Sequence, residues 1–396
     1  MDHDKLRKLT NRGWNTWYTP SMTSHVLLPY GFCIGLCFKS RSEPKVIRFL
    51  KVGDRDLRPA ERSWDGAYTR LSFSAGSTKI TVESAEKDGE QFLLVTPGEG
   101  EGPAPALVIE ASLLWGRPGS VFLKDGRLGA EFADGKRVDI YTTGRKDGFV
   151  HALGSCPCVS VTLDGPVAVA TVPVTVGHAR GVMDSARAAV LGQEAGYGAD
   201  AEVYRAMRSC LAWNTVYDPE HDRICTPVNR NWSEGNGGYV LFEWDTFFAA
   251  LMCGMDNREL ALLNAFAITD EMTDDGFVPN FAVSNGGKSR DRSQPPVGAM
   301  TVLRLWERFR EDWFVKEMFA PLYRWNTWFH ERRRLPGGAM CWGSDDYISQ
   351  SGMKNETTDV GNLQGAKYES GLDNSPMYDG AVLTPRRAIC FWRTWV

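Results

Sequence analysis

The 396-residue sequence predicts an antiparallel β-sandwich followed by a mostly helical domain. Up to about residue 180, short β-rich runs are separated by turn signals such as Lys-Asp-Gly and Ala-Asp-Gly, which are typical of β-hairpins. Beyond that point apolar residues recur every three or four positions, as they do along amphipathic helices. We therefore expect a sandwich domain over residues 1–182 and a helical domain over residues 183–396.

The predicted elements follow in order along the chain. Closely spaced strand-like runs with hairpin turns indicate an antiparallel sandwich. These runs cover residues 46–54, 68–95, 106–116, 120–143 and 158–177. Helical spacing of apolar residues predicts helices over residues 183–195, 201–217, 243–255, 257–272, 298–312 and 313–334. At 43% hydrophobic and 11% aromatic residues, the chain can bury substantial cores.

Charge, hydropathy and cysteine usage exclude several classes of function. Forty-five basic against forty-nine acidic residues leave a net charge of −4 with no basic block, so nucleic acid is not an expected partner. The first residues lack the apolar core of a signal peptide, and the most apolar segment is interrupted by Glu243 and Asp245, so we expect no membrane contact and a cytoplasmic protein. Nine cysteines in mostly apolar runs, and six histidines without ligand spacing, predict reduced thiols, no metal and no other cofactor.

Four polar loops between the predicted helices are long enough to carry function: residues 229–248, 273–296, 340–351 and 367–376. They mix aromatic residues with Asp, Asn, Gln and Arg. A pyranose needs this mixture, because its C–H faces stack on aromatic rings while its hydroxyls need fixed donors and acceptors. The alternative is that the tryptophans belong to the core and the acids cap helices. Four such loops at successive helix junctions favour a carbohydrate pocket.

Three motifs in these loops carry a family resemblance. "FEWDTFF" at 242–248, "DRSQPP" at 291–296 and "ESGLDNSP" at 369–376 resemble the signatures of glycoside hydrolase family 63 and its mannosylglycerate hydrolase-like relatives, with trehalases more distant. The opening segment 12–32 resembles the start of bacterial members in which a β-sandwich precedes the catalytic barrel. The resemblance implies a six-hairpin glycosidase, with residues 183–396 forming the N-terminal half of an (α/α)6 barrel.

The resemblance also implies a catalytic acid. Inverting hydrolysis uses an acid and a base about 6.5–9.5 Å apart, with the water between them. The acid matches Asp373, which must be kept protonated by an apolar wall or a nearby negative charge. Glu369 supplies that charge or binds substrate in this interpretation. The alternative role for Asp373 is to cap a helix before Pro376.

Substrate-binding roles are implied for residues of the same motifs. Trp244 and Asp245 would stack on a sugar and accept its hydroxyls, although Asp245 alone would usually be interpreted as a helix cap. Gln294 would donate and accept along one sugar edge, and Arg292 would pair with Asp245 or another site acid. The full implied substrate-binding set is Phe242, Trp244, Asp245, Arg292, Gln294, Trp342, Glu369 and Gly371.

The catalytic base has no matching segment, so the sequence predicts a truncated glycosidase with little or no hydrolytic activity. Residues 381–396 lack a helical or strand period and are expected to be a non-native tail. Back-translated in the frame that starts on each codon's third base, "AICFWRTWV" can give HL(F/L)LADVG, which resembles the helix after the family's acid loop. A frameshift near residues 378–383 would explain both features.

The expected partner is a carbohydrate: an α-glucoside, a mannosylglycerate-like glycoside or an oligosaccharide. Two other classes stay open at this point. One is a carbohydrate-binding remnant without catalysis, and the other is an inverting glycoside phosphorylase, which needs only one carboxylate because phosphate is the nucleophile. A uronate lyase is disfavoured, because the sequence shows no Asn, His, Tyr constellation and no basic groove. The sequence gives no indication of the oligomeric state.

Overall fold

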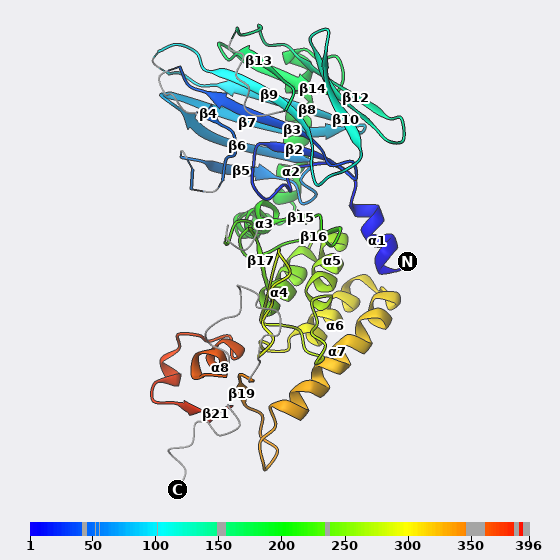
Figure 1. Cartoon of the computed structure of the whole chain (residues 1–396), viewed down its shortest axis with the longest axis vertical. Helices are drawn as coiled ribbons and strands as arrows, with labels where there is room; N and C mark the ends of the chain where they lie inside the picture. The colour runs from blue at the N-terminus through cyan, green and yellow to red at the C-terminus, as the bar shows by residue number, and fades with distance from the viewer. Residues whose placement is uncertain are drawn as a thin grey trace. The chain divides into compact units, whose positions relative to one another are not determined.

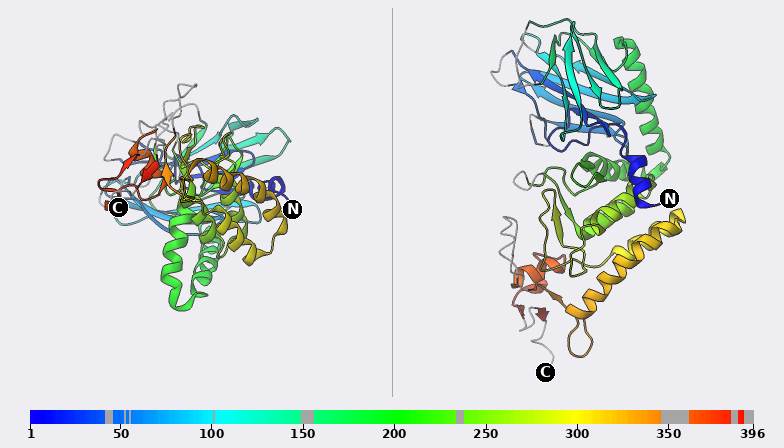
Figure 2. Two further views of the ribbon diagram at one scale, coloured as in Figure 1. Left: turned by 90° about the horizontal axis from the view of Figure 1, so that it is seen from below. Right: turned by 45° about the vertical axis from the view of Figure 1, so that its right-hand side comes forward.

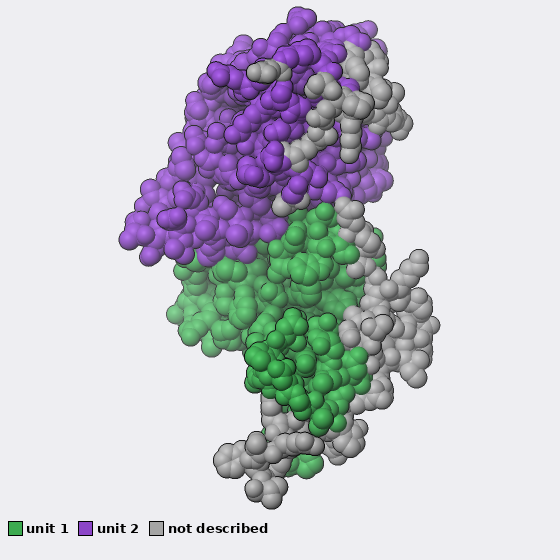
Figure 3. All heavy atoms as spheres, turned by 90° about the vertical axis from the view of Figure 1, so that its left-hand side faces the viewer, with its two compact units in different colours: residues 1–10, 220–396 green, residues 11–219 purple. Residues whose placement is uncertain are grey.

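The computed structural model describes residues 1–41, 46–51, 53–54, 56–100, 102–148, 156–233, 238–345, 361–383 and 388–390. The chain forms two compact units, one of residues 11–219 and one of residues 1–10 with 220–396 (Figure 3). The predicted domain boundary after residue 182 falls inside helix α2 (Val176–Ala195), which belongs to the first unit.

Two antiparallel sheets build the first unit (Figure 1). Strand order in the first sheet is β1 (Gly13–Asn15), β2 (Ser24–Leu28), β3 (Phe32–Lys39), β9 (Ala106–Leu113) and β13 (Cys158–Thr162), with β4 (Val46–Ile47) paired to β3. The second sheet runs β10 (Gly119–Lys124), β11 (Arg127–Phe132), β12 (Arg137–Thr142), β14 (Val167–Ala170), β8 (Glu90–Pro97), β7 (Thr78–Lys87), β6 (Tyr68–Ala75) and β5 (Arg58–Arg62). The predicted antiparallel pairing is confirmed.

One hydrophobic core is shared by the two sheets. Ile34 and Phe38 on β3 belong to the same buried cluster as Phe73 on β6 and Val82 on β7. Leu36, which lies on the same face of β3, also belongs to this cluster, whereas Cys33 and Cys37 do not, because side chains alternate between the faces of a strand. The shared core makes the two sheets the layers of a sandwich.

Helix α2 covers the other face of the second sheet and shares a second apolar cluster with it (Figure 2, right). The helix begins where the Thr175 side chain accepts a hydrogen bond from the His178 N–H. A 3-10 turn η1 (Gly198–Asp200), helix α3 (Ala201–Asn214) and strand β15 (Val216–Asp218) complete the unit.

Helices dominate the second unit: α1 (His3–Thr10), α4 (Glu243–Cys253), α5 (Arg258–Thr269), α6 (Gly298–Phe309), α7 (Asp312–Arg332) and α8 (Leu363–Glu369). Its short strands are β16 (Arg223–Cys225), β17 (Val240–Phe242), β18 (Phe281–Val283) and β19 (Trp342–Gly343). The four helices α4 to α7 end within one turn of the predicted positions. Asn257 caps α5 by accepting from the Leu260 N–H, and Arg310, at φ 56°, ends α6 in the left-handed conformation.

The segment after residue 380 contains regular structure that the sequence pattern did not predict. Strands β20 (Val382–Leu383) and β21 (Ala388–Cys390) pair with each other, and β21 also pairs with β19. Ile389 is buried in a cluster with Ala366 and Tyr378, and this burial favours the short strands. Parts of two predicted segments lie outside the described residues: 384–387 and 391–396 of the predicted tail, and 346–351 of the third predicted loop.

None of the helices in the described ranges combines the length and the hydropathy that crossing a lipid bilayer requires.

Candidate functional site

A pocket of about 530 Å³ lies where the three motif segments meet in the second unit. This volume is within the usual range of small-molecule sites, about 300–1,000 Å³. Its lining consists of Val228, Trp232, Phe242, Trp244, Asp245, Asn280, Phe281, Arg292, Gln294, Tyr368, Gly371 and Asp373. All the predicted site residues except Trp342 and Glu369 are therefore brought together in one pocket.

The β17–β18 pair places the first motif. Phe242 at the end of β17 lies opposite Phe281 of β18, and the Glu243 N–H then donates to the Asn280 carbonyl at 3.1 Å. The chain enters α4 at this point, so Trp244 and Asp245 project from the first turn of the helix. Phe242 holds the N-cap position, and Asp245 lies inside the helix instead of capping it.

Gly371 lets the third motif approach the first. Its φ of +71° is in the left-handed region, and a Cβ at this position would come within 2.5–3.0 Å of three ring atoms of Trp244. Real Cβ atoms are not found at such distances, so glycine is required both for the turn and for the contact. The loop that carries Asp373 thus packs directly against the indole of Trp244.

Both pocket aspartates hold their protons more tightly than a free aspartate does. Burial raises the pKa of Asp373, and the positive charge of Arg292 opposes this effect. Burial also raises the pKa of Asp245, where the negative charge of Asp373 adds to the shift and a hydrogen bond from Trp244 opposes it. The structure does not use Asp373 as the helix cap, because Ser375 caps the 3-10 helix η3 (Pro376–Tyr378).

Arg292 is fixed at the bottom of the pocket with 1% of its surface exposed. It donates to Asp291 Oδ2 at 2.7 Å and to Asn280 Oδ1 at 3.1 Å, and its guanidinium lies 4.9 Å from the centre of the Tyr368 ring. Its ion pair is thus with Asp291, the adjacent residue, and not with Asp245. Its charge nevertheless acts on the Asp373 carboxyl.

Gln294 offers a buried acceptor. Only 6% of the residue is exposed, and its Oε1 atom has no hydrogen-bond partner among the described residues. An unpaired buried amide oxygen costs free energy, and a ligand hydroxyl that donates to it recovers that cost.

Glu243, directly before Trp244, is a buried acid that the sequence reasoning did not single out as a site residue. It is fully buried, and neither carboxyl oxygen has a hydrogen-bond partner within the described part of the chain. Burial, together with the nearby charge of Asp245, raises the pKa of Glu243 well above its usual value. The neutral acid is the form that this environment favours.

Glu369 lies beneath the pocket lining instead of in it. Its carboxylate is fully buried and accepts four hydrogen bonds: from Arg333 Nε at 2.5 Å and Nη2 at 3.0 Å, from the Ser293 N–H at 3.1 Å and from the Gly343 N–H at 2.6 Å. Burial raises the pKa of Glu369, and the Arg333 charge and the two backbone N–H groups counteract that shift. These contacts tie the second motif to the third.

Arg333 connects this anchor to a third segment. It donates to Asp345 Oδ1 at 2.8 Å and to the Asp291 carbonyl at 3.3 Å. Ser344 Oγ in turn donates to Asp291 Oδ2 at 2.6 Å. A buried ionic network therefore supports Asp291, whose carboxylate holds Arg292 in the pocket.

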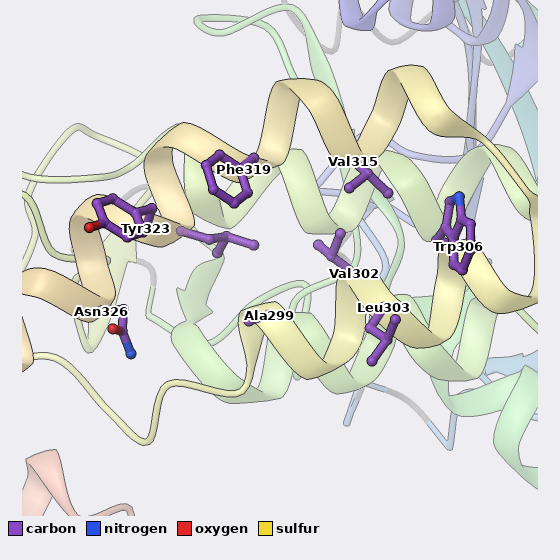
Figure 4. Close-up of a pocket in the computed structure, with 9 residues that line it drawn as sticks. Ala299, Val302, Leu303, Trp306, Val315, Phe319, Tyr323 and Asn326 are labelled. Carbon is purple, nitrogen blue, oxygen red and sulfur yellow. The ribbon is translucent and has the colours of Figure 1, made fainter.

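Trp342 lines a different cavity, of about 320 Å³, together with Phe329, His330 and Cys341. An apolar groove of about 490 Å³ is lined by residues of α6, among them Val302 and Leu303, and of α7, among them Val315 and Phe319 (Figure 4). Neither cavity is lined by a carboxylate. No group of three or more His, Cys, Asp or Glu side chains in the described ranges is placed to hold a metal ion.

Some pocket residues were not predicted individually. Trp232, Asn280, Phe281 and Tyr368 lie within the loops predicted to carry function, and their aromatic and amide character was the available signal. Arg333 follows the end of α7 and had no local signal, because its partners are distant in the sequence.

Comparison with known proteins supports the resemblance of the motif segments. Residues 238–387 match the family model of the mannosylglycerate hydrolase MGH1-like glycoside hydrolase domain. A bacterial glucoamylase complexed with acarbose is similar at 12% identity and a TM-score of 0.40, over 78% of this chain and 57% of the glucoamylase. A polysaccharide lyase is similar at 11% identity and a TM-score of 0.24, over 80% of this chain and 68% of the lyase. A search of curated proteins finds no match.

Proposed function

Because residues 238–387 match a glycoside hydrolase domain, we propose that the pocket is the sugar site of an inverting glycosidase in which Asp373 is the proton donor. The domain match supports the glycosidase class, and the mechanism and the residue roles rest on the geometry of the pocket. One observation carries the proposal: Asp245, Arg292 and Asp373 belong to three separate motifs and line a single pocket.

The environment of Asp373 suits a general acid. Partial burial raises its pKa, so that at a given pH a larger fraction of this carboxyl keeps its proton than in a free aspartate. When the proton passes to the leaving glycosidic oxygen, the carboxylate that forms is stabilised by the positive charge of Arg292. Arg292 cannot move away easily, because Asp291 and Asn280 hold its guanidinium.

The remaining lining suits the recognition of a sugar ring. Trp244 offers a ring face, Asp245 accepts hydroxyl groups when ionised, and the unpaired Gln294 Oε1 accepts another. The catalytic base is not assigned to any described residue. The proposed substrates are α-glucosides, mannosylglycerate-like glycosides or oligosaccharides.

The helical hairpins α4–α5 and α6–α7 fit the first helix pairs of an (α/α)6 barrel, and we include this arrangement in the proposal. Aromatic contacts continue between the pairs, since Phe247 of α4 stacks on Trp325 of α7 with the ring centres 6.0 Å apart. Gly298 permits this packing, because a Cβ there would lie 2.8–2.9 Å from Phe247, Leu322 and Trp325.

Carbohydrate binding without turnover is the second candidate function. Asp245 and Asp373 are the carboxylates in the described lining, and the proposal assigns Asp245 to substrate hydroxyls. The pocket can therefore hold a sugar without completing an inverting displacement, which needs a base as well as an acid.

The test combines calorimetry and a hydrolysis assay on α-linked glucosides, mannosides and mannosylglycerate. Asp373→Asn is compared with Asp274→Asn, an exposed aspartate outside the pocket. We expect sugar binding to both variants within about threefold of the wild-type chain. Any turnover is expected to fall roughly 100-fold or more in Asp373→Asn, which is the usual size of a general-acid contribution.

Each outcome of this test has a distinct meaning. Binding without turnover in the wild-type chain supports the second candidate function. Turnover that survives Asp373→Asn unchanged on a substrate with a poor leaving group removes Asp373 from the acid role. A wild-type chain that binds none of these sugars contradicts both functions.

A further inference from the structure

We propose that Trp232 is a stacking platform for a second sugar ring at the mouth of the pocket, so that the site prefers ligands of at least two sugar units. This inference rests on the proposed carbohydrate site and adds a specificity residue that neither the motifs nor the domain match assigns. The matched domain begins at residue 238, after Trp232.

The pocket changes in character from its floor to its rim. The floor is polar and buried, since Asn280, Arg292 and Gln294 are 5%, 1% and 6% exposed. The rim is apolar and open, because Trp232 is 55% and Val228 is 40% exposed. A first sugar in contact with the floor buries its hydroxyl groups, whereas a further ring must lie against the apolar rim.

Trp232 differs from the other aromatic residues of the lining. Phe242, Trp244, Phe281 and Tyr368 are each partly buried, and Trp232 alone among these lining rings is exposed for more than half of its surface. Single exposed aromatic residues are common on protein surfaces. Trp232, however, lines a pocket with polar groups at its base, and this position suits a ligand that has both polar and apolar surfaces.

Local structure holds the indole in place. Asn229 Oδ1 accepts from the Asn231 N–H at 2.9 Å, and Ser233 and Gly238 exchange two backbone hydrogen bonds of 2.9 Å. These contacts fix the chain on both sides of Trp232. Its ring meets the Phe242 ring at an interplanar angle of 73° with the centres 5.2 Å apart, which is the favourable edge-to-face arrangement.

A braced and exposed indole suits the outer ring of an oligosaccharide. The C–H groups of a pyranose face are apolar and slightly positive, and the face of an indole is apolar and electron-rich. The ring is already held before binding, so stacking on it costs little ordering of the side chain. A monosaccharide bound at the polar floor does not need this contact.

The experiment measures binding by calorimetry for D-glucose, maltose and maltotriose, and for D-mannose and α-1,2-mannobiose. The variants are Trp232→Ala, Trp232→Phe and, as a matched exposed aromatic outside the pocket, Tyr323→Ala. We expect Trp232→Ala to weaken the disaccharides and the trisaccharide roughly tenfold, the effect of one lost aromatic contact, and to change monosaccharide binding by less than about twofold. Trp232→Phe should retain most of the affinity, and Tyr323→Ala should bind as the wild-type chain does.

The outcomes separate the platform from the site. Equal weakening of monosaccharides and disaccharides, or no weakening of either, overturns the role of Trp232 while the proposed sugar site stands. A wild-type chain that binds the monosaccharides as tightly as the longer sugars also overturns it. If the wild-type chain binds none of the sugars, the proposed site and the platform are both wrong. Circular dichroism of Trp232→Ala, with retained monosaccharide binding, shows that the variant is folded.

Discussion

The buried ion pair of Arg333 and Glu369 gives the most quantitative prediction. The guanidinium donates two hydrogen bonds to Glu369, of 2.5 and 3.0 Å, and the two side chains are 2% and 0% exposed. Arg333→Met removes one charge of the pair and leaves the other buried. Breaking a buried pair in this way costs about 3–5 kcal/mol, because the remaining ion has no compensating partner. We expect this loss for the part of the second unit that surrounds the pocket.

Two comparisons isolate the cause. Arg304 and Glu307 form a pair at 2.9 Å on the surface of α6, with side chains 64% and 43% exposed, so Arg304→Ala should cost less than about 0.5 kcal/mol. The double change Arg333→Met with Glu369→Gln removes both charges and keeps an acceptor for the Ser293 or Gly343 N–H. Its cost should therefore be smaller than the sum of the two single changes.

Amide hydrogen exchange is the suitable measurement, because a chain of two compact units does not have to unfold in one step. The Ser293 and Gly343 amides donate to Glu369 and report on the network directly. Arg333→Met should lower their protection roughly 100-fold or more, which corresponds to about 3 kcal/mol. Amides of β7 in the other unit are the internal reference. Protection at both sites equal to that in Arg304→Ala would refute the reasoning.

Two further predictions concern a glycine and a histidine. Gly371→Ala should lower the free energy of unfolding more than Gly286→Ala does, and it should also weaken sugar binding. Both glycines have a positive φ, a conformation that costs a residue with a side chain roughly 1–2 kcal/mol, but only the Cβ added at position 371 would clash with Trp244. Equal free energies of unfolding and unchanged binding would contradict this. Burial lowers the pKa of His25 to about 3. As the pH falls, His25 is therefore protonated in the unfolded chain before it is protonated in the folded chain. The free energy of unfolding should then fall between pH 6.5 and pH 3, with a loss of about 2 kcal/mol at pH 5. Denaturant unfolding of the first unit at pH 7.5 and pH 5 measures this loss of stability. The loss should be smaller in His25→Gln and unchanged in His178→Gln, a control at an exposed histidine. If the two variants show the same pH dependence, the assignment to His25 is wrong.

The sequence predicted strands best where one face of the strand is polar. Buried and less buried residues alternate along β6 and along β7, and both strands lie within the strand-like run predicted over residues 68–95. Strands β2 and β3 were missed, because Ser24–Leu28 is buried along its whole length and Phe32–Lys39 along most of it. Cys33 and Cys37 occupy the face of β3 opposite to Ile34 and Phe38. Apolar residues therefore lie on both faces of this strand, and its sequence lacks the apolar–polar alternation that would identify it.

The start of α2 shows the opposite problem. The β-branched run that ends β14 continues to Val176, and propensity alone extended the predicted strand to residue 177. The chain instead leaves β14 after Ala170, and the Thr175 cap begins the helix. The Thr175 side chain accepts a hydrogen bond from the His178 N–H, so this threonine acts as a helix cap although the β-branched residues around it favour a strand.

For the site, motif resemblance was sufficient to bring Asp245, Arg292 and Asp373 together, whereas Glu369 of the same motif does not line the pocket. Glu369 and Asp373 are four residues apart, and on a continuous helix they would share one face. The helix α8 ends at Glu369, however, and Gly371 at φ +71° turns the chain, so Asp373 reaches the pocket while Glu369 remains below it. What fixes Glu369 there is Arg333, 36 residues earlier in the sequence, and such pairing arises only from the tertiary fold. One glycine and one distant arginine thus give two neighbouring acids different environments: Glu369 is buried in an ion pair, and Asp373 lines a pocket that is open to a ligand.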